Sequence, residues 1–198
     1  LPPRHALRSI ASMTRTPTYP GRRNPPPARM RGVTMIELMI GIAIIGTLLA
    51  LAAPSMRDMI MNSRMTSQTN DLMADFAVAR SMAANRGQRV VMCASSNGTS
   101  CTGTWPNGRI LFVDTNTNGA LDGGEEVLKT EPALSSGTVV TVTGLTTSTQ
   151  VQFRPSGMAV GLSGSTATFA LCDGRTGPYG RTITVTPTGR TSVAKTTC

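Results

Sequence analysis

The stretch from Arg31 to Ile40, RGVTMIELMI, opens the longest apolar run of this 198-residue chain. The run extends from Val33 to Ala53, and Glu37 is its only charged residue. About 20 apolar residues are enough for a helix to cross a bilayer. A carboxylate inside such a span costs about 2.5–3.5 kcal/mol at the centre and by default marks a functional site. The sequence therefore predicts a transmembrane helix over residues 33–53 with a functional Glu37; the bland alternative is a glutamate hydrated near the membrane surface.

The basic character of the chain is concentrated before this span. The formal net charge is +9, and residues 1–32 hold seven arginines and no acidic residue. This segment is also rich in proline and cannot bury a core, so we expect a basic leader over 1–32. Arginines just before an apolar span stay on the cytoplasmic side. The charge therefore predicts a single-pass membrane protein with a cytoplasmic N-terminus and an exported remainder.

The region after the span, residues 54–87, is polar but keeps a helical pattern. Apolar residues recur at spacings of three, four or seven: Met65, Leu72, Phe76, Ala79 and Ala83. This spacing predicts one buried stripe. The other faces are expected to carry Arg64, Gln68, Asp71, Asp75 and Arg80. Gly87 is placed to end the helix, and Pro54 lacks a backbone donor, so a kink or local melting is expected there.

From residue 88 to 198 the chain is rich in Thr, Val, Gly and Ser, which is typical of short strands separated by turns. The predicted strands are 89–93, 109–114, 126–129, 138–143, 151–154, 166–172 and 181–186. No helical pattern interrupts them, so the sheet should be antiparallel. The helix stripe needs an apolar partner, and the sheet face provides one. The expected fold class is α+β, with a long N-terminal helix packed on an antiparallel sheet.

All four cysteines follow the apolar span, on the side predicted to be exported, where disulfides are permitted. Four cysteines allow three pairings. A Cys93–Cys101 bond would close a short turn-forming loop and leave Cys172–Cys198 to tether the C-terminal residues. Free buried thiols are the alternative.

Catalysis is not expected. The only histidine is His5, in the leader, so no histidine-based triad or zinc cluster can form in residues 88–198. We therefore predict a protein that is not an enzyme.

One loop matches the calcium pattern D-x-[DN]-x-[DN]-G-x5-E at every defined position. Its candidate ligands are Asp114, Asn116, Asn118, Ala120 (through its carbonyl), Asp122 and Glu125. Strands are predicted on both sides of the loop, where an EF-hand needs helices. We therefore favour a hairpin loop in which Asp and Asn side chains bond the nearby backbone, and expect no cofactor; calcium is the less favoured alternative.

A basic set lies near the C-terminal end of the sequence. Residues 140–198 hold five basic residues and one acidic residue, and Gly-Arg-Thr occurs three times. A basic patch of this kind suits phosphate binding. The candidate DNA-binding residues are Arg175, Arg181, Arg190 and Lys195, and the alternative is a solvated strand edge with scattered charges.

The opening stretch closely resembles the class III signal of type IV pilins and type II secretion pseudopilins. The resemblance rests on Gly32, then Val33-Thr34-x-x-Glu37, then the apolar span; Pro54 also falls where this family has a proline. It implies that a prepilin peptidase cuts between Gly32 and Val33, and that the new amine of Val33 is methylated. Glu37 would pair with the N-terminal amine of a neighbouring subunit during assembly. Val33 departs from the phenylalanine that is commoner in the family.

The remaining sequence resembles the GspH/FimT branch of minor pilins. The resemblance covers about residues 31–191 and is carried by VMCASSNGTSC (91–101), Trp105, Gly108, the loop 112–126, FRPSG (153–157), LCD (171–173) and PTGR (187–190). It implies a type IV pilin fold and a structural subunit, with other pilins or pseudopilins in a helical fibre as partners. On the FimT side, a Gly-Arg-x-Arg motif is associated with binding incoming DNA. Here Gly189-Arg190-Thr191-Ser192 keeps the first arginine and lacks the second.

One rival interpretation treats the apolar run as a secretory signal peptide. Residues 39–49 would form its apolar region, and Ala50-Leu51-Ala52 its cleavage site, so that the exported protein would begin at Ala53. This interpretation leaves Glu37 unexplained. We therefore expect a structural minor pilin or pseudopilin of a type IV pilus or type II secretion pseudopilus, and keep DNA binding for natural transformation as the alternative function.

Overall fold

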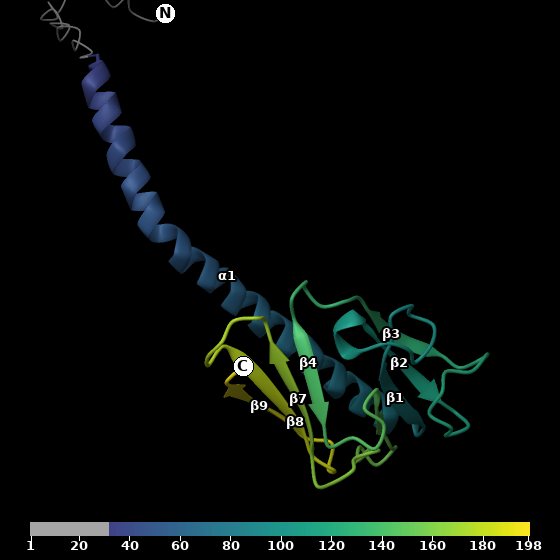
Figure 1. Ribbon diagram of the computed structural model, residues 1–198. Coiled ribbons are helices and arrows are strands. Elements are labelled where there is room, and N and C mark those ends of the chain that lie inside the picture. Colours follow the sequence, from purple (N-terminus) through teal and green to yellow (C-terminus); the bar gives the residue numbers. More distant parts are fainter. Residues whose placement is uncertain (1–31) are drawn as a thin grey trace, which may run out of the picture. The chain divides into compact units, whose positions relative to one another are not determined.

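The computed structural model describes residues 32–198 (Figure 1). The predicted leader lies outside the described residues except for Gly32. The chain divides into two units, residues 1–45 and 46–198, and each is described by itself.

In the first unit, residues 32–34 have no regular secondary structure, and helix α1 (Met35–Arg86) begins at Met35. The helix starts two residues later than the apolar run because Thr34 caps it: the Thr34 hydroxyl oxygen accepts a hydrogen bond from the Glu37 backbone N–H at 3.3 Å. All residues from Met35 to Ile45 are exposed except Gly41, which is half-buried. By length and composition alone, α1 qualifies as a membrane-crossing helix.

In the second unit, α1 continues from Gly46 to Arg86 and contains Pro54. The helix is uninterrupted at this proline, so the local melting considered from the sequence is not present. The helix ends as predicted. Gly87 follows Arg86 with a φ of 65°, a left-handed conformation that glycine adopts without a steric cost.

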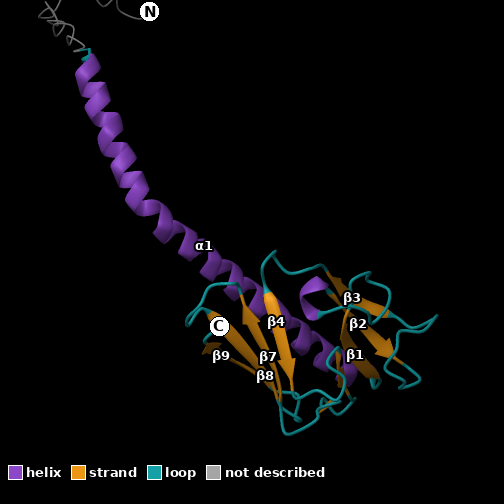
Figure 2. Ribbon diagram, viewed as in Figure 1, coloured by secondary structure: helices purple, strands orange, loops and turns teal. Residues whose placement is uncertain are grey.

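Nine strands follow the helix (Figure 2). They are β1 (Arg89–Ala94), β2 (Arg109–Asp114), β3 (Val127–Glu131), β4 (Val139–Thr143), β5 (Gln150–Phe153), β6 (Ala159–Val160), β7 (Ala167–Cys172), β8 (Gly180–Val185) and β9 (Thr191–Thr196). A short 3-10 turn, Trp105–Asn107, precedes β2. The strands form two sheets, in the orders β3-β2-β1-β5-β6 and β4-β7-β8-β9, and every pair of neighbouring strands is antiparallel.

The expectation of one sheet is therefore wrong, while the antiparallel pairing and seven of the strands are confirmed. The sequence missed β6 because it has only two residues, and β9 because its residues are exposed on both faces and show no apolar alternation. β9 is the edge strand of the second sheet, so it has a neighbour on one side only.

The main core lies between α1 and both sheets, and every residue of the predicted helix stripe is buried in it. Phe76 occupies the middle of this core. Its ring lies 5.1 Å from that of Phe169 on β7 and 6.5 Å from that of Phe153 on β5, both edge-to-face. Burying one such side chain contributes about 1.5–3 kcal/mol. One helix stripe thus joins the two sheets.

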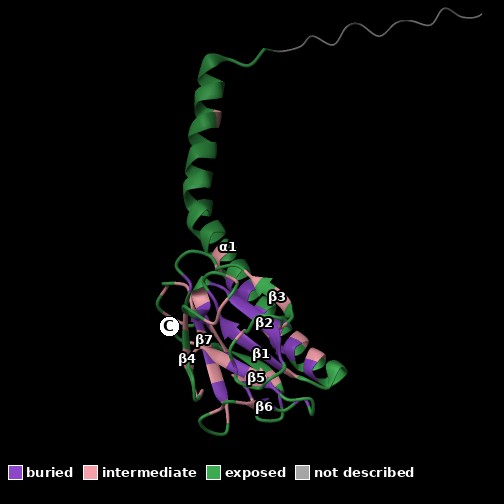
Figure 3. Ribbon diagram, turned by 90° about the vertical axis from the view of Figure 1, so that its right-hand side faces the viewer, coloured by how far each residue is buried: buried purple, intermediate pink, exposed green. Residues whose placement is uncertain are grey.

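A smaller apolar cluster lies on the other face of the first sheet. Val91, Cys93, Ile110 and Phe112 are fully buried there, and Figure 3 colours β1 and β2 as buried. Cys101 and Leu121 pack against this cluster from the loops that follow β1 and β2. These two loops therefore cover a face of the sheet that α1 does not reach.

Both disulfides considered from the sequence are present. Cys93 is bonded to Cys101 and Cys172 to Cys198, with Cα–Cα distances of 5.5 and 5.8 Å. The second bond is supported by two backbone hydrogen bonds between Gly177 and Cys198. It holds the last residues of the sequence against the end of β7.

Candidate functional site

The Gly32–Val33 bond lies in the non-helical segment before α1. Both residues are exposed, with Val33 at 68%, and a methyl group placed on Gly32 would meet no atom within 4 Å. The regular backbone hydrogen bonding starts just beyond, where Leu38 N–H donates to the Thr34 carbonyl at 3.1 Å. Within the described residues, this peptide bond is therefore exposed and outside the helix.

Glu37 lies in the first turn of α1, where the unpaired N–H groups of the helix favour a negative charge. Its side chain is exposed, and within residues 32–198 it takes part in no ion pair. The carboxylate thus remains available to a positive group from outside the chain.

The six calcium candidates lie along the loop between β2 and β3, where the described residues form no group of three or more acidic, His or Cys side chains placed to hold a metal ion, and the loop's carboxylates accept hydrogen bonds from the loop itself. Asp114 is buried, and its two oxygens accept the backbone N–H groups of Asn118 (3.1 Å) and Gly119 (3.0 Å). Glu125 accepts the backbone N–H groups of Thr115 (2.8 Å) and Asp122 (3.1 Å). Burial acts to raise the pKa of Glu125, but these bonds outweigh it and leave the pKa lowered.

The amide side chains of the loop close the same network. Asn116 and Asn118 donate to one oxygen of Asp122 at 2.7 and 2.6 Å, which lowers the pKa of that carboxyl. The oxygen of Asn118 accepts the Ala120 backbone N–H at 2.7 Å. Strands β2 and β3 flank the loop, and its geometry is that of a self-bonded turn.

The four basic candidates differ in how free their charges are, and Arg175 is the most engaged. Its guanidinium donates to Asp173 at 3.1 Å and to Asn62 on α1 at 3.0 Å, and it lies 3.5 Å from the carboxylate of Asp58. It also stacks over the ring of Tyr179, 4.1 Å from the centroid. The Asp173 partner raises the pKa of Arg175, and the side chain is 14% exposed. Arg175 therefore fastens the loop after β7 to α1.

Arg181 and Lys195 lie directly opposite each other in the β8–β9 pairing. Arg181 donates to the backbone carbonyls of Tyr179 (3.3 Å) and Gly180 (3.0 Å), whereas Lys195 is exposed. Like charges in register cost stability, and a bound anion would relieve that cost.

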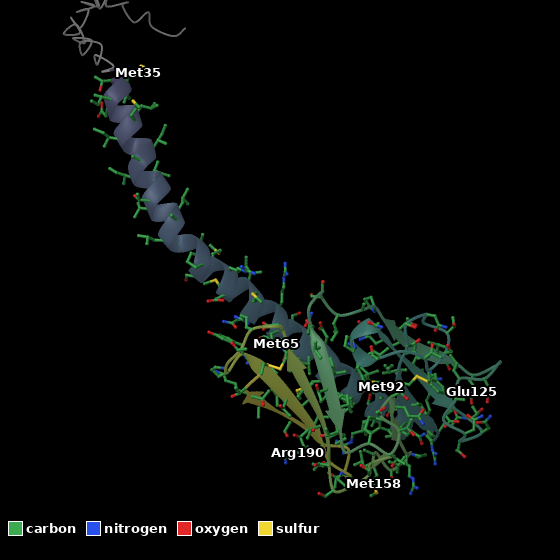
Figure 4. The ribbon with its side chains drawn as sticks, in the orientation of Figure 1. Met35, Met65, Met92, Glu125, Met158 and Arg190 are labelled. Carbon is green, nitrogen blue, oxygen red and sulfur yellow. A yellow bond between two sulfur atoms is a disulfide. The ribbon has the colours of Figure 1, made fainter. Side chains whose placement is uncertain are left out.

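Arg190 lies at the opposite end of β9, in the turn that precedes the strand (Figure 4). It is exposed and lines a groove with a volume of about 520 Å³ together with Arg80 of α1. The structure thus separates the four basic candidates: Arg175 is bound to α1, Arg181 and Lys195 face each other, and Arg190 is apart from them.

The sequence analysis missed a buried ion cluster. Asp75 is 0% exposed and pairs with Arg109, which is 2% exposed; its other oxygen lies 2.6 Å from the Lys129 ammonium. Lys129 also pairs with Glu131 at 2.7 Å, and the bond to Asp75 is the main cause of its raised pKa. Asp75 was expected on another face of the helix, and this was wrong.

A signal for Asp75 was present in the sequence. Leu72, Asp75, Phe76 and Ala79 follow the spacing i, i+3, i+4, i+7, so Asp75 belongs to the buried stripe. Gln68 was misplaced in the same way; it is 7% exposed, and its oxygen accepts the hydroxyl of Thr138 at 3.0 Å.

Comparisons with known proteins agree with this architecture. The model of the family "Type II transport protein GspH" matches residues 68–189, and that of the "Prokaryotic N-terminal methylation motif" matches residues 27–53. The chain belongs to the GspH family.

Solved structures with a similar fold include two minor subunits. The type IV minor pilin FimU of Pseudomonas aeruginosa has a TM-score of 0.51 and 19% identity, over 67% of this chain and 89% of FimU. The minor pseudopilin EpsH from the Type 2 Secretion System of Vibrio cholerae has a TM-score of 0.48 and 10% identity, over 67% of this chain and 97% of EpsH. Family and fold together confirm the predicted type IV pilin fold and define this chain as a minor pilin or pseudopilin, a subunit of a pilus or pseudopilus.

Proposed function

We propose that the chain is made as a precursor, cut between Gly32 and Val33 by a prepilin peptidase, and methylated on the amine of Val33. The observation that carries this proposal is an exposed, non-helical Gly32–Val33 bond directly before a capped helix with Glu37 in its first turn. A GspH-family head and a methylation motif on the same chain support it.

The apolar part of α1 holds the processed subunit in the inner membrane. The arginines of residues 1–32 keep that end cytoplasmic, and the head with its two disulfides lies in the periplasm. Other pilins or pseudopilins of the fibre are the partners of the subunit, and no catalytic step is assigned to it.

Glu37 serves assembly. Its carboxylate has no ion-pair partner within residues 32–198, and a lone charge in lipid is costly. The methylated amine of a neighbouring subunit neutralises the charge when that subunit packs alongside. Extraction into the fibre is favoured because it exchanges an unpaired ion for a paired one.

Sequencing the N-terminus of the membrane-bound protein tests the processing step. The expected first residue is Val33, carrying one additional methyl group by mass. Gly32→Leu should leave the precursor uncut, while Gly41→Leu, at a position where an added side chain also meets no atom within 4 Å, should be cut normally. An N-terminus at Ala53 would replace this proposal with a secreted protein released from a signal peptide.

The genes next to the gene of this protein would show which assembly contains the subunit. Genes for a secretion ATPase and a secretin next to other pseudopilins would assign the subunit to a type II secretion pseudopilus. A cluster of minor pilins with a large tip adhesin would assign it to a type IV pilus.

A second function, DNA binding during natural transformation, is favoured by the free charges of Arg190 and Lys195. Both side chains are exposed, and neither has an ion pair within the described part of the chain. Contacts to phosphates give affinity that falls with salt by a slope of about −0.9 per phosphate. The test is a gel-shift titration with the processed chain, which begins at Val33, in non-ionic detergent. Retardation at low salt that weakens in Arg190→Ala supports this function, and no retardation at low salt overturns it.

A further inference from the structure

The groove that contains Arg190 lies between the C-terminal half of α1 and the turns that precede β6 and β9. Its lining combines small helix residues, two turn glycines and two arginines. The turns meet here because Ala159 N–H donates to the Pro187 carbonyl at 2.9 Å. In Figure 4, Arg190 and Met158, one residue beyond the first turn, both lie at this end of the head.

Both charges in this groove are positive. Arg80 comes from α1 and Arg190 from the turn, and no acidic residue lines the groove. Neither arginine has an ion pair within residues 32–198. The hydroxyl residues Ser81, Ser156 and Thr191 line it as well. Guanidinium groups with nearby hydroxyls match the oxygens of a phosphate, which accept several hydrogen bonds at once.

Gly157 and Gly189 let the turns before β6 and β9 pack closely against each other and against Arg80 of α1. Gly189 has a φ of 74°, and a side chain there would clash with the Gly157 carbonyl. Methyl groups built on Gly157 and Gly189 would lie 3.2 and 3.1 Å from Arg80 Nε. The Arg80 guanidinium therefore lies against both turns, and a side chain at either position would crowd it.

We propose that Arg80 and Arg190 together bind one phosphate group of a nucleic-acid backbone. This inference rests on the second function proposed above and makes Arg80, a helix residue outside the C-terminal basic set, a phosphate-binding residue. Arg175 is not part of the site because its guanidinium is held by Asp173 and α1.

Lys195 provides the next contact. Alternate residues of a strand point to the same face, so Lys195 shares a face of β9 with Thr191, which lines the groove. Four residues of strand place the two about 13 Å apart. A nucleic-acid strand bound in the groove and running along β9 therefore meets a third positive charge, that of Lys195.

The test compares four variants of the processed chain, which begins at Val33 and lacks the seven leader arginines, in non-ionic detergent: Arg80→Ala, Arg190→Ala, the double variant and Arg64→Ala. Arg64 is the matched control because it is an exposed arginine of α1 outside the groove. Fluorescence anisotropy with a short single-stranded DNA at low salt gives the dissociation constants, and thermal unfolding verifies that each variant is folded.

Each single groove variant should weaken binding about tenfold, as expected for a lost charge-assisted hydrogen bond. The double variant should weaken it by less than the product of the two, because both arginines hold one phosphate. The salt slope should fall by about 0.7, the value of one phosphate of a single strand, in the double variant, and Arg64→Ala should bind like the parent protein.

Three results would overturn this site. Normal binding by Arg80→Ala with weak binding by Arg190→Ala would leave the DNA-binding function standing without the groove. Equal losses in Arg64→Ala would mean diffuse attraction. Competition by polyglutamate as strong as by DNA of equal charge would identify a carboxylate-bearing protein as the ligand. No DNA binding by the parent protein at low salt would remove the function itself.

Discussion

The carboxylate of Asp75 on α1 and the guanidinium of Arg109 at the start of β2 form an ion pair that is almost completely hidden from water. Lys129 and Glu131 on β3 extend the pair into a cluster with equal numbers of positive and negative charges. The cluster joins the helix to the first sheet beside an otherwise apolar core. Its energetic role differs from that of the apolar stripe, because a buried charge without its partner is far more costly than a missing methyl group.

We expect Asp75→Asn to destabilise the protein by about 3–5 kcal/mol, because it removes the close counter-charge of the buried Arg109 and leaves only Glu131, 3.9 Å away. Urea unfolding followed by circular dichroism measures the change. Asp71→Asn, an exposed acid one turn away on α1, is the control and should change the free energy of unfolding by less than about 0.5 kcal/mol. Equal small effects of both substitutions would show that Arg109 finds other partners.

Gly189→Ala should destabilise the head by about 1–3 kcal/mol, because alanine is strained at a φ of 74° and its methyl group meets the Gly157 carbonyl. Gly174→Ala separates the two causes. Gly174 has a φ of 79°, but a methyl group at this position would meet no atom within 4 Å, so the substitution should show only the conformational cost. A loss at Gly174 as large as at Gly189 would contradict the close contact.

The two disulfides should differ in their contribution to stability. The two cysteines of the Cys93–Cys101 bond are 8 positions apart in sequence, and those of the Cys172–Cys198 bond are 26 apart. For these loops the chain-entropy model gives stabilisations of about 2.5 and 3.5 kcal/mol. Paired Cys→Ser variants of each bond, unfolded in urea, measure this difference. We expect Cys172/Cys198 to cost more, and the reverse order would show that covering the apolar face around Cys93 outweighs loop closure.

The pair between Asp173 and Arg175 should make stability depend on pH. The hydrogen bond that the Asp173 carboxylate accepts from Arg175 lowers the pKa of Asp173 below the usual value of about 3.9. A lowered carboxyl pKa contributes stability that is complete above the unfolded pKa and lost as the pH falls through the folded one. The gap in Tm between the parent protein and Arg175→Gln should therefore be widest near pH 6 and close towards pH 2. Arg64→Gln should show no such closing, and a constant gap for Arg175→Gln would contradict the assignment.

Calcium should not stabilise the β2–β3 loop. Its carboxylates accept backbone and amide hydrogen bonds, which an ion would have to replace. Thermal unfolding with millimolar calcium and with chelator should give the same Tm. An ion present at 100 times its dissociation constant would add about 2.7 kcal/mol, a shift that this measurement detects easily.

The sequence predicted the helix and most strands because their patterns are local. The stripe from Met65 to Ala83 and Gly87 at the C-terminal end of the helix depend on residues within a few positions of each other. The division into two sheets could not be predicted, because it depends on the pairing of β4 with β7, which is distant in sequence, and not with a strand of the first sheet. β9 has no apolar face to reveal it.

The candidate site was predictable only in part. The cysteine pairs and the basic residues were identified by type, but the state of each charge depends on partners distant in sequence. Arg175 is neutralised by Asp58 and Asp173, the first of which lies 117 positions away. Arg80 was predicted only to lie on a helix face other than the buried stripe, and the fold places it in the same groove as Arg190.

The bridge from Arg175 to Asp58 and Asn62 also has a mechanical meaning. Asp58 lies four residues beyond Pro54, and the loop that carries Arg175 is closed by the Cys172–Cys198 bond. A pull along α1 from its N-terminal side therefore reaches the second sheet through this bridge before it reaches the apolar stripe at Met65. The Cys172–Cys198 bond behind the loop joins this contact to the end of β7, so the link between α1 and the second sheet at this point is covalent on the sheet side.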